Sequence, residues 1–199
     1  EATLGIDLLL EQEGGVFLTL ASIYEFQGDN QKAKEYYHKG LEMLPNHVQG
    51  RRKLLLRYLE ENNTDAVIEQ AVNLLKIEPN DAVTHFILGA IYKKKGMFDE
   101  AVKELKSAIS LEKNMSQGYI QLAYVYLRQK KREEAVNILN KAINLSFCNQ
   151  NMEVPLLLGL IYLQNKQYEK AVEVYRRILW HSPNNQEAWY QMGMANERL

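Results

Sequence analysis

A pattern of about 34 residues recurs along the whole chain and limits the folds open to it. In residues 88–105, LGAIYKKKGMFDEAVKEL, a Leu-Gly pair is followed three residues later by Tyr and nine residues after that by Ala. Rows that begin at residues 14, 48, 82, 116, 152 and 186 are offset by 34, 34, 34, 36 and 34. Each full row can be read as two short amphipathic helices joined by a turn, so the sequence predicts stacked helix pairs.

Small and large residues occupy the places in each row that two packed helices require. Gly or Ala at the eighth place, as at Gly89 and Ala123, lets the second helix approach the first closely. Ala at the twentieth place, as at Ala101, does the same from the other side, and large residues at places seven, eleven and twenty-four fill the remaining space. Because one pair cannot cover its own apolar face, we expect the pairs to stack into a solenoid.

This period and these residues resemble the tetratricopeptide repeat family, whose pattern is W-x2-L-G-x2-Y…A-x3-F…P, over residues 14–199. The resemblance implies an all-α fold, a right-handed α-α superhelix of about five helix pairs. We expect residues 1–13 to be the remnant of a preceding repeat helix and residues 186–199 to be the first helix of a sixth repeat or a capping helix. The full repeats are predicted at 14–47, 48–81, 82–115, 116–151 and 152–185.

Several departures from the pattern lead to further expectations. The second repeat is degenerate, with Val67 where Ala is usual and a turn at 61–64 that we expect to be irregular. The fourth repeat has two extra residues near 147–150, which predict a longer loop. Apolar residues on more than one side of the terminal helix suggest a segment of a longer array. The alternative is that this helix is the natural cap and packs in a dimer.

The sequence carries no sign of catalytic, cofactor-binding or metal-binding chemistry. It lacks the phosphate-binding, dinucleotide-binding, zinc-protease and serine-hydrolase motifs. No histidine pairs with another ligand-type residue at helical spacing, and a single cysteine, Cys148, leaves no disulfide or Cys-based zinc cluster within the chain. One cysteine is compatible with a reducing compartment and favours the cytoplasm. We therefore expect a protein that is not an enzyme.

Charge and hydropathy restrict the partners. With 24 basic and 25 acidic residues the chain has no overall field that would attract nucleic acid or an anionic membrane. No apolar run approaches the roughly 18 residues that a membrane-spanning helix needs. The expected partner is another protein, bound through a peptide or helix segment, and a homo-oligomer is a further possibility.

A second side of the first helices is the candidate binding surface. Places two, five, nine and twelve of each row point more than about 100° away from the partner helix. The resemblance implies that this side lines the concave groove, where family members bind peptides. Here it is apolar through its middle, and contiguous apolar surface marks a binding site. The candidate groove residues are Leu18, Arg52, Leu56, Leu59, Phe86, Ala90, Lys93, Ile120, Tyr124, Leu127, Arg128, Leu156, Leu160, Leu163, Tyr190 and Met194.

The residues of this surface decide which segment it would take. Family members that hold a partner's C-terminal carboxylate use Lys, Arg and Asn at places two, five, six and nine, but here only Arg52 and Lys53 are basic, in one row. An apolar or amphipathic segment is therefore the better candidate. The alternative is that these side chains pack between neighbouring repeats. The function expected is a scaffold or adaptor; the other readings are a docking or regulatory arm of a larger enzyme and a self-assembling scaffold.

Overall fold

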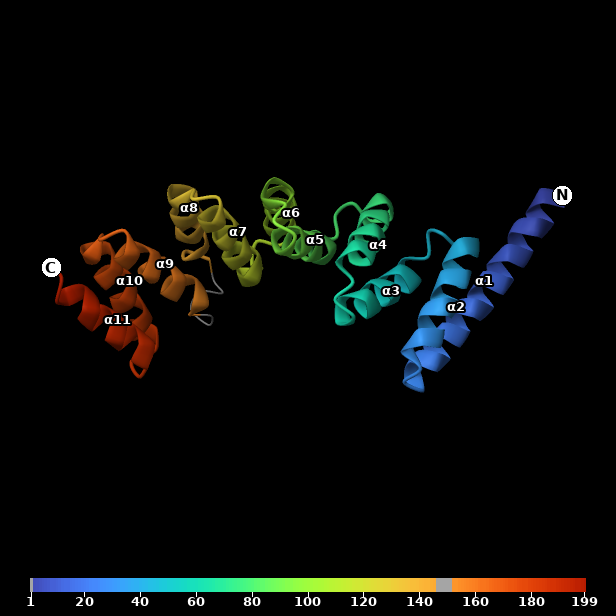
Figure 1. The fold of residues 1–199 in the computed structure, drawn as a ribbon, viewed down its shortest axis with the longest axis horizontal. Helices are drawn as coiled ribbons and strands as arrows, with labels where there is room; N and C mark the ends of the chain where they lie inside the picture. Colours follow the sequence, from blue (N-terminus) through green and yellow to red (C-terminus); the bar gives the residue numbers. More distant parts are fainter. Residues whose placement is uncertain (1, 146–151) are drawn as a thin grey trace. The chain divides into compact units, whose positions relative to one another are not determined.

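Eleven helices make up the described part of the computed structural model, which covers residues 2–145 and 152–199 (Figure 1). No strand occurs within those residues. The loop expected near 147–150 and Cys148 lie outside them. The helices are α1 Ala2–Phe26, α2 Asn30–Met43, α3 Val48–Glu60, α4 Thr64–Ile77, α5 Ala82–Lys94, α6 Phe98–Leu111, α7 Ser116–Arg128, α8 Arg132–Ala142, α9 Glu153–Gln164, α10 Tyr168–His181 and α11 Gln186–Asn196.

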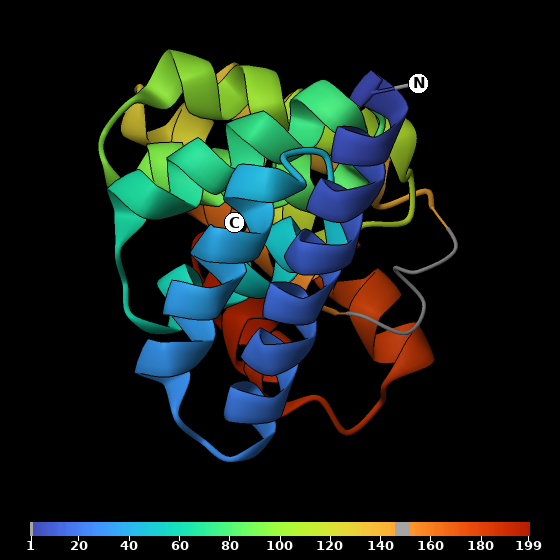
Figure 2. The same cartoon turned by 90° about the vertical axis from the view of Figure 1, so that its right-hand side faces the viewer.

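The chain forms two units, residues 1–91 and residues 92–199, and each is described by itself. In the first unit α1 and α2 run side by side as an antiparallel pair, as both views show (Figures 1 and 2). The core beside them contains Ala21, Ala33, Tyr37 and Leu54 of α3, which hold places that the repeat pattern assigns to packing. It also contains Leu18 and Leu41. In the second unit the fully buried residues of the pairs α7–α8 and α9–α10 include Leu122, Leu139, Leu158, Tyr175 and Ile178.

The two helices of every pair are joined by the same turn. One residue in each turn has a positive φ, and the next backbone N–H donates to the carbonyl of a tyrosine five residues earlier, as in a Schellman motif. The expectation of an irregular turn at 61–64 is wrong, because Asn62 (φ 55°) fills the same place as Gly28 (φ 80°). The positive-φ residues are Gly28, Asn62, Gly96, Lys130 and Lys166.

The break expected between residues 13 and 14 does not form. Helix α1 continues from Ala2 to Phe26, so residues 2–13 extend the first helix of the first pair and are not a separate helix. No proline interrupts this stretch, and Gly14 lies against Leu44 at the end of α2. A Cβ atom there would lie 2.6 Å from Cγ of Leu44, so glycine allows the end of α2 to approach closely.

The predicted all-α class is confirmed for the described residues. None of the described helices combines the length and the apolar character that crossing a membrane requires.

Candidate functional site

A pocket of about 470 Å³ lies in the second unit, between α7, α9 and α11. Its lining residues on these helices hold places two, five, six and nine of their repeats, and the side of a first helix that carries these places is called the inner side. The volume of the pocket falls within the range of roughly 300–1,000 Å³ that is common for ligand sites. The lining residues are Gln117, Ile120, Gln121 and Tyr124 from α7, Glu153, Leu156, Leu157 and Leu160 from α9, Tyr175 from α10, and Glu187 and Gln191 from α11.

Helix α9 supplies the apolar wall of the pocket because it is apolar on both sides. Its sequence, EVPLLLGLIYLQ, buries Leu158 and Ile161 in the core of the unit, while Leu160 remains 39% exposed. Across the pocket, Tyr124 of α7 is 44% exposed. Large apolar side chains that line a concave surface and stay in contact with water are suited to a partner's side chain.

Polar groups line one edge of the pocket, where Gln117, Glu153 and Glu187 lie near the N-terminal ends of α7, α9 and α11. Gln117 Nε2 donates to Glu153 Oε2 at 2.7 Å, and Gln191 Nε2 donates to Glu187 Oε1 at 2.6 Å. Glu153 and Glu187 lie in the first turns of α9 and α11, where the helix dipole stabilises negative charge. The pocket therefore combines an apolar wall with an anionic edge.

Tyr175 lies beneath the pocket with its hydroxyl group unpartnered. The ring passes directly over Gly159, since a Cβ atom there would lie 2.6 Å from Cζ and 2.8 Å from Oη of Tyr175. The side chain is 0% exposed, and its hydroxyl has no hydrogen-bond partner among the described residues. Burial raises the pKa of Tyr175, and the charge of Glu187 raises it further, so the phenol stays protonated.

The first repeat shows the same tyrosine with its hydroxyl group satisfied. Tyr37, at the place that corresponds to Tyr175, donates to Glu25 Oε2 at 2.9 Å and lies 3.4 Å from Ser22 Oγ. Ser22 and Glu25 are at places nine and twelve of their row. In the fifth repeat those places are Leu160 and another leucine, which offer no acceptor.

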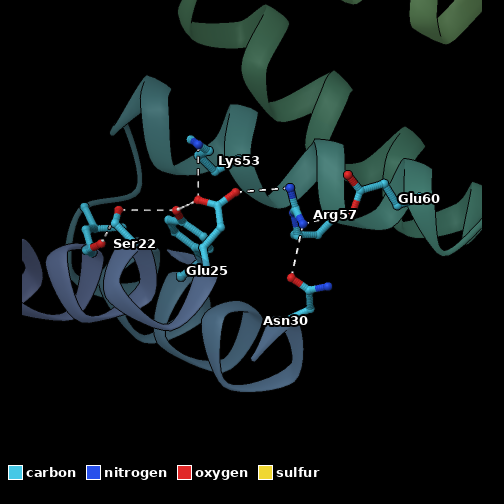
Figure 3. A network of polar contacts seen from close by, with 8 residues as sticks. Ser22, Glu25, Asn30, Lys53, Arg57 and Glu60 are labelled. Carbon is cyan, nitrogen blue, oxygen red and sulfur yellow. Dashed lines mark hydrogen bonds and ion pairs between the residues drawn. The ribbon is translucent and has the colours of Figure 1, made fainter. Parts of the chain in front are cut away.

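Ion pairs extend this polar contact across the inner side of α1 and α3 (Figure 3). Lys53 Nζ and Arg57 Nη2 each lie 3.1 Å from a carboxylate oxygen of Glu25, and Arg57 Nη1 donates to Asn30 at 3.1 Å. Burial raises the pKa of Glu25, but Lys53, Tyr37 and Arg57 together lower it more, so the net pKa is below its ordinary value. These charges occupy the inner side of the first unit.

Four of the sixteen candidate groove residues lie together in the pocket: Ile120, Tyr124, Leu156 and Leu160. Leu18 was placed wrongly, because its side chain packs against Gly40 and Gly50 in the core. Leu18 is 7% exposed, and Ile120 is as deeply buried at 6% but lines the pocket. The close approach of α2 and α3, permitted by these glycines, encloses it.

Two basic candidates make contacts within their own units. Arg52 pairs with Glu78 and, at 2.8 Å, with Asp81 Oδ2, both just beyond α4. Lys93 donates to the side chain of Gln121 and lies 5.9 Å from the ring centroid of Tyr124. Burial lowers the pKa of Lys93, and Arg128 lowers it further. Like Leu18, Arg52 and Lys93, the remaining candidates lie outside the pocket lining: Leu56, Leu59, Phe86, Ala90, Leu127, Arg128, Leu163, Tyr190 and Met194.

Sequence reasoning missed the floor of the pocket. Tyr175 was assigned to the core, and the pairing of a glycine at place eight with a tyrosine at place twenty-four was the signal that could have revealed it. Gln121 and Gln191 were also missed, because place six was considered only for the basic pattern that binds a carboxylate and not for the apolar surface.

Comparison with known proteins identifies the family. Sequence profiles of the tetratricopeptide repeat match residues 15–47, 92–145 and 120–188. No curated protein matches the chain. The fold is similar to the crystal structure of MamA protein, with a TM-score of 0.74, 22% identity and coverage of 85% of this chain and 92% of that one.

Two further solved structures share the fold. One is YrrB, described as a TPR protein with an unusual peptide-binding site, with a TM-score of 0.68, 16% identity and coverage of 87% and 89% of the two chains. The other is the APC/C hetero-tetramer Cut9–Hcn1, with a TM-score of 0.58, 19% identity and coverage of 92% of this chain and 36% of that one. The repeat profiles, the helix pairs and their common turns together show that the chain belongs to the tetratricopeptide repeat family.

Proposed function

We propose that the protein is a protein-interaction scaffold that binds a peptide or helix segment of another protein in the pocket between α7, α9 and α11. The observation that carries this proposal is the concave, partly exposed apolar wall formed by Leu156, Leu160 and Tyr124. Membership of a family of repeat proteins that serve as interaction scaffolds supports it. YrrB, which shares the fold, is described as having a peptide-binding site.

The binding free energy would come from burying a few apolar side chains of the segment. Full burial of a leucine-sized side chain contributes about 1.5–3 kcal/mol, and part of that gain offsets the loss of freedom of the bound segment. Two or three such anchors contribute about 3–9 kcal/mol before that cost is subtracted, so we expect affinities weaker than about 1 μM, which corresponds to −8.2 kcal/mol.

The variant Leu160→Glu tests the proposal against a matched control. Leu111 of α6 is 42% exposed, close to the 39% of Leu160, and does not line the pocket. A displayed library of random 12-residue peptides is selected on the wild-type protein, and enriched peptides are measured by fluorescence anisotropy. We expect them to bind the wild type and Leu111→Glu equally and to lose measurable binding to Leu160→Glu.

Circular dichroism of the two variants completes the test. Helical content and melting temperature should stay close to the wild-type values in both, because both leucines are partly exposed. Peptides that bind Leu160→Glu as well as they bind the wild type would refute binding in this pocket. Unfolding of Leu160→Glu alone would show that Leu160 serves the core.

A further inference from the structure

The unpartnered hydroxyl group of Tyr175 is the feature from which the chemistry of the occupant can be inferred. A buried hydroxyl without a partner is costly, and native structures nearly always satisfy such groups. Tyr37 in the first repeat is satisfied by Glu25, so the fold can supply an acceptor at this place. In the fifth repeat leucines replace the polar residues, and Tyr175 Oη, beneath the pocket, has no hydrogen-bond partner among the residues that the structure describes.

The charges at the pocket select between possible occupants. Glu153 and Glu187 are the only charged side chains among the described residues that line it. Lys93 contacts two residues of the lining, since it donates to the side chain of Gln121 and lies 5.9 Å from the ring centroid of Tyr124. An acidic segment would be repelled at the edge formed by Glu153 and Glu187, and a wholly apolar one would leave Tyr175 Oη buried without a partner.

We propose, building on the function proposed above, that the pocket recognises a lysine or arginine side chain on an otherwise apolar segment of a partner protein. The aliphatic stem of that side chain packs over Leu156 and Leu160, and its cationic group donates to the carboxylate of Glu187 and to Tyr175 Oη. Long basic side chains combine an apolar stem with a charged head, which matches an apolar wall that ends in a carboxylate.

The neighbouring contacts fit this assignment. Glu187 accepts from Gln191, a neutral side chain that can rotate away, and its charge already acts on Tyr175. The hydroxyl of Tyr175 is closed to solvent, so the head group reaches it through rotamer changes of the side chains around it. Such changes are common when a partner binds.

Three peptides of 12 residues test the inference by fluorescence anisotropy. They share a leucine-rich, uncharged sequence and differ at one central residue, which is arginine, norleucine or glutamate. Norleucine keeps the aliphatic stem and lacks the charge. We expect the arginine peptide to bind about tenfold more tightly than the norleucine peptide, a difference that one charge-assisted hydrogen-bond network can supply. The glutamate peptide should bind least well.

Variants assign the effect to the two residues. Glu187→Gln and Tyr175→Phe should each reduce the preference for arginine over norleucine by at least threefold. Glu173→Gln, an exposed residue of α10, and Tyr37→Phe are the matched controls and should keep the full preference. The preference should also fall as salt is raised.

The outcomes separate this inference from the proposed function. If arginine and norleucine peptides bind equally, with binding lost in Leu160→Glu, the pocket is a peptide site but cation recognition is refuted. Tighter binding of the glutamate peptide, or an arginine preference that survives in both Glu187→Gln and Tyr175→Phe, also refutes it. If none of the three peptides binds, the inference fails, and the library selection with Leu160→Glu decides the proposed function separately.

Discussion

Removing the hydroxyl groups of Tyr37 and Tyr175 one at a time should change stability in opposite directions. Both tyrosines hold the twenty-fourth place of a repeat and are almost fully buried, with exposures of 1% and 0%. They differ in their partners: Tyr37 donates to Glu25 at 2.9 Å, whereas Tyr175 Oη has no partner among the described residues. Phe in either place removes one oxygen atom and preserves the ring.

The magnitudes follow from these contacts. A hydrogen bond to a charged group contributes roughly 1.5–3 kcal/mol, and Lys53 and Arg57 still contact Glu25 in Tyr37→Phe, so we expect a loss of about 1–2 kcal/mol. An unpartnered buried hydroxyl costs about 1–3 kcal/mol in mutational data, and the small void left behind offsets part of its removal. Tyr175→Phe should therefore raise the free energy of unfolding by about 0–2 kcal/mol.

Urea unfolding followed by circular dichroism measures both changes, and hydrogen exchange of α2 and α10 assigns them to the two units. Hydrogen exchange is measured by mass spectrometry on separate peptides of α2 and α10, because repeat units need not unfold together. In the apo protein, Tyr37→Phe should speed exchange in α2, and Tyr175→Phe should slow it or leave it unchanged in α10. Clear destabilisation by Tyr175→Phe would refute the reasoning, since it would show that the hydroxyl group is already satisfied in the free protein.

Three further predictions concern the packing, the turns and the ion pairs. Gly159→Ala should destabilise the protein by about 1–3 kcal/mol in thermal unfolding, because its Cβ atom would lie 2.6 Å from Tyr175 Cζ; an unchanged melting temperature would show that the ring is displaced easily. Lys130→Gly should stabilise it by about 0.5–1 kcal/mol, since φ is 60° there and the left-handed conformation favours glycine; a lower urea midpoint would contradict this. Glu25 has a pKa below its ordinary value of 4.5, so its stabilising contribution is present above that pH and is lost as the pH falls through the lower folded-state pKa. Glu25→Gln should therefore flatten the decline of stability as the pH falls below 4.5, and an equal slope in wild type and variant would contradict the ion-pair assignment.

The repeat pattern was sufficient to predict the fold class. Small residues at places eight and twenty, such as Ala123 and Ala135, are 0% exposed, as close packing of two helices requires. A period that is held over most of the chain leaves few alternatives to stacked helix pairs. The continuity of α1 was not predicted, because the repeat register begins at Gly14 and assigned residues 1–13 to a preceding helix.

The candidate site was predictable in one unit and not in the other. Helical spacing alone puts Leu18 and Leu156 at the same place of their repeats, yet Leu18 is buried against Gly40 and Leu156 lines the pocket. The difference depends on contacts with residues of other helices, which spacing within one helix does not contain. Arg52 was similarly indistinguishable from a free cation until its pairing with Asp81 was seen.

Methyl NMR of the wild-type protein, titrated with the arginine-bearing peptide, tests the central claim most directly. Binding in the pocket should shift the methyl signals of Ile120, Leu156 and Leu160 first and most strongly. The signals of Leu18 and Leu54, which lie in the core of the first unit, should stay in place. Saturable shifts that centre on the first unit, with the signals of Leu156 and Leu160 unmoved, would contradict the account.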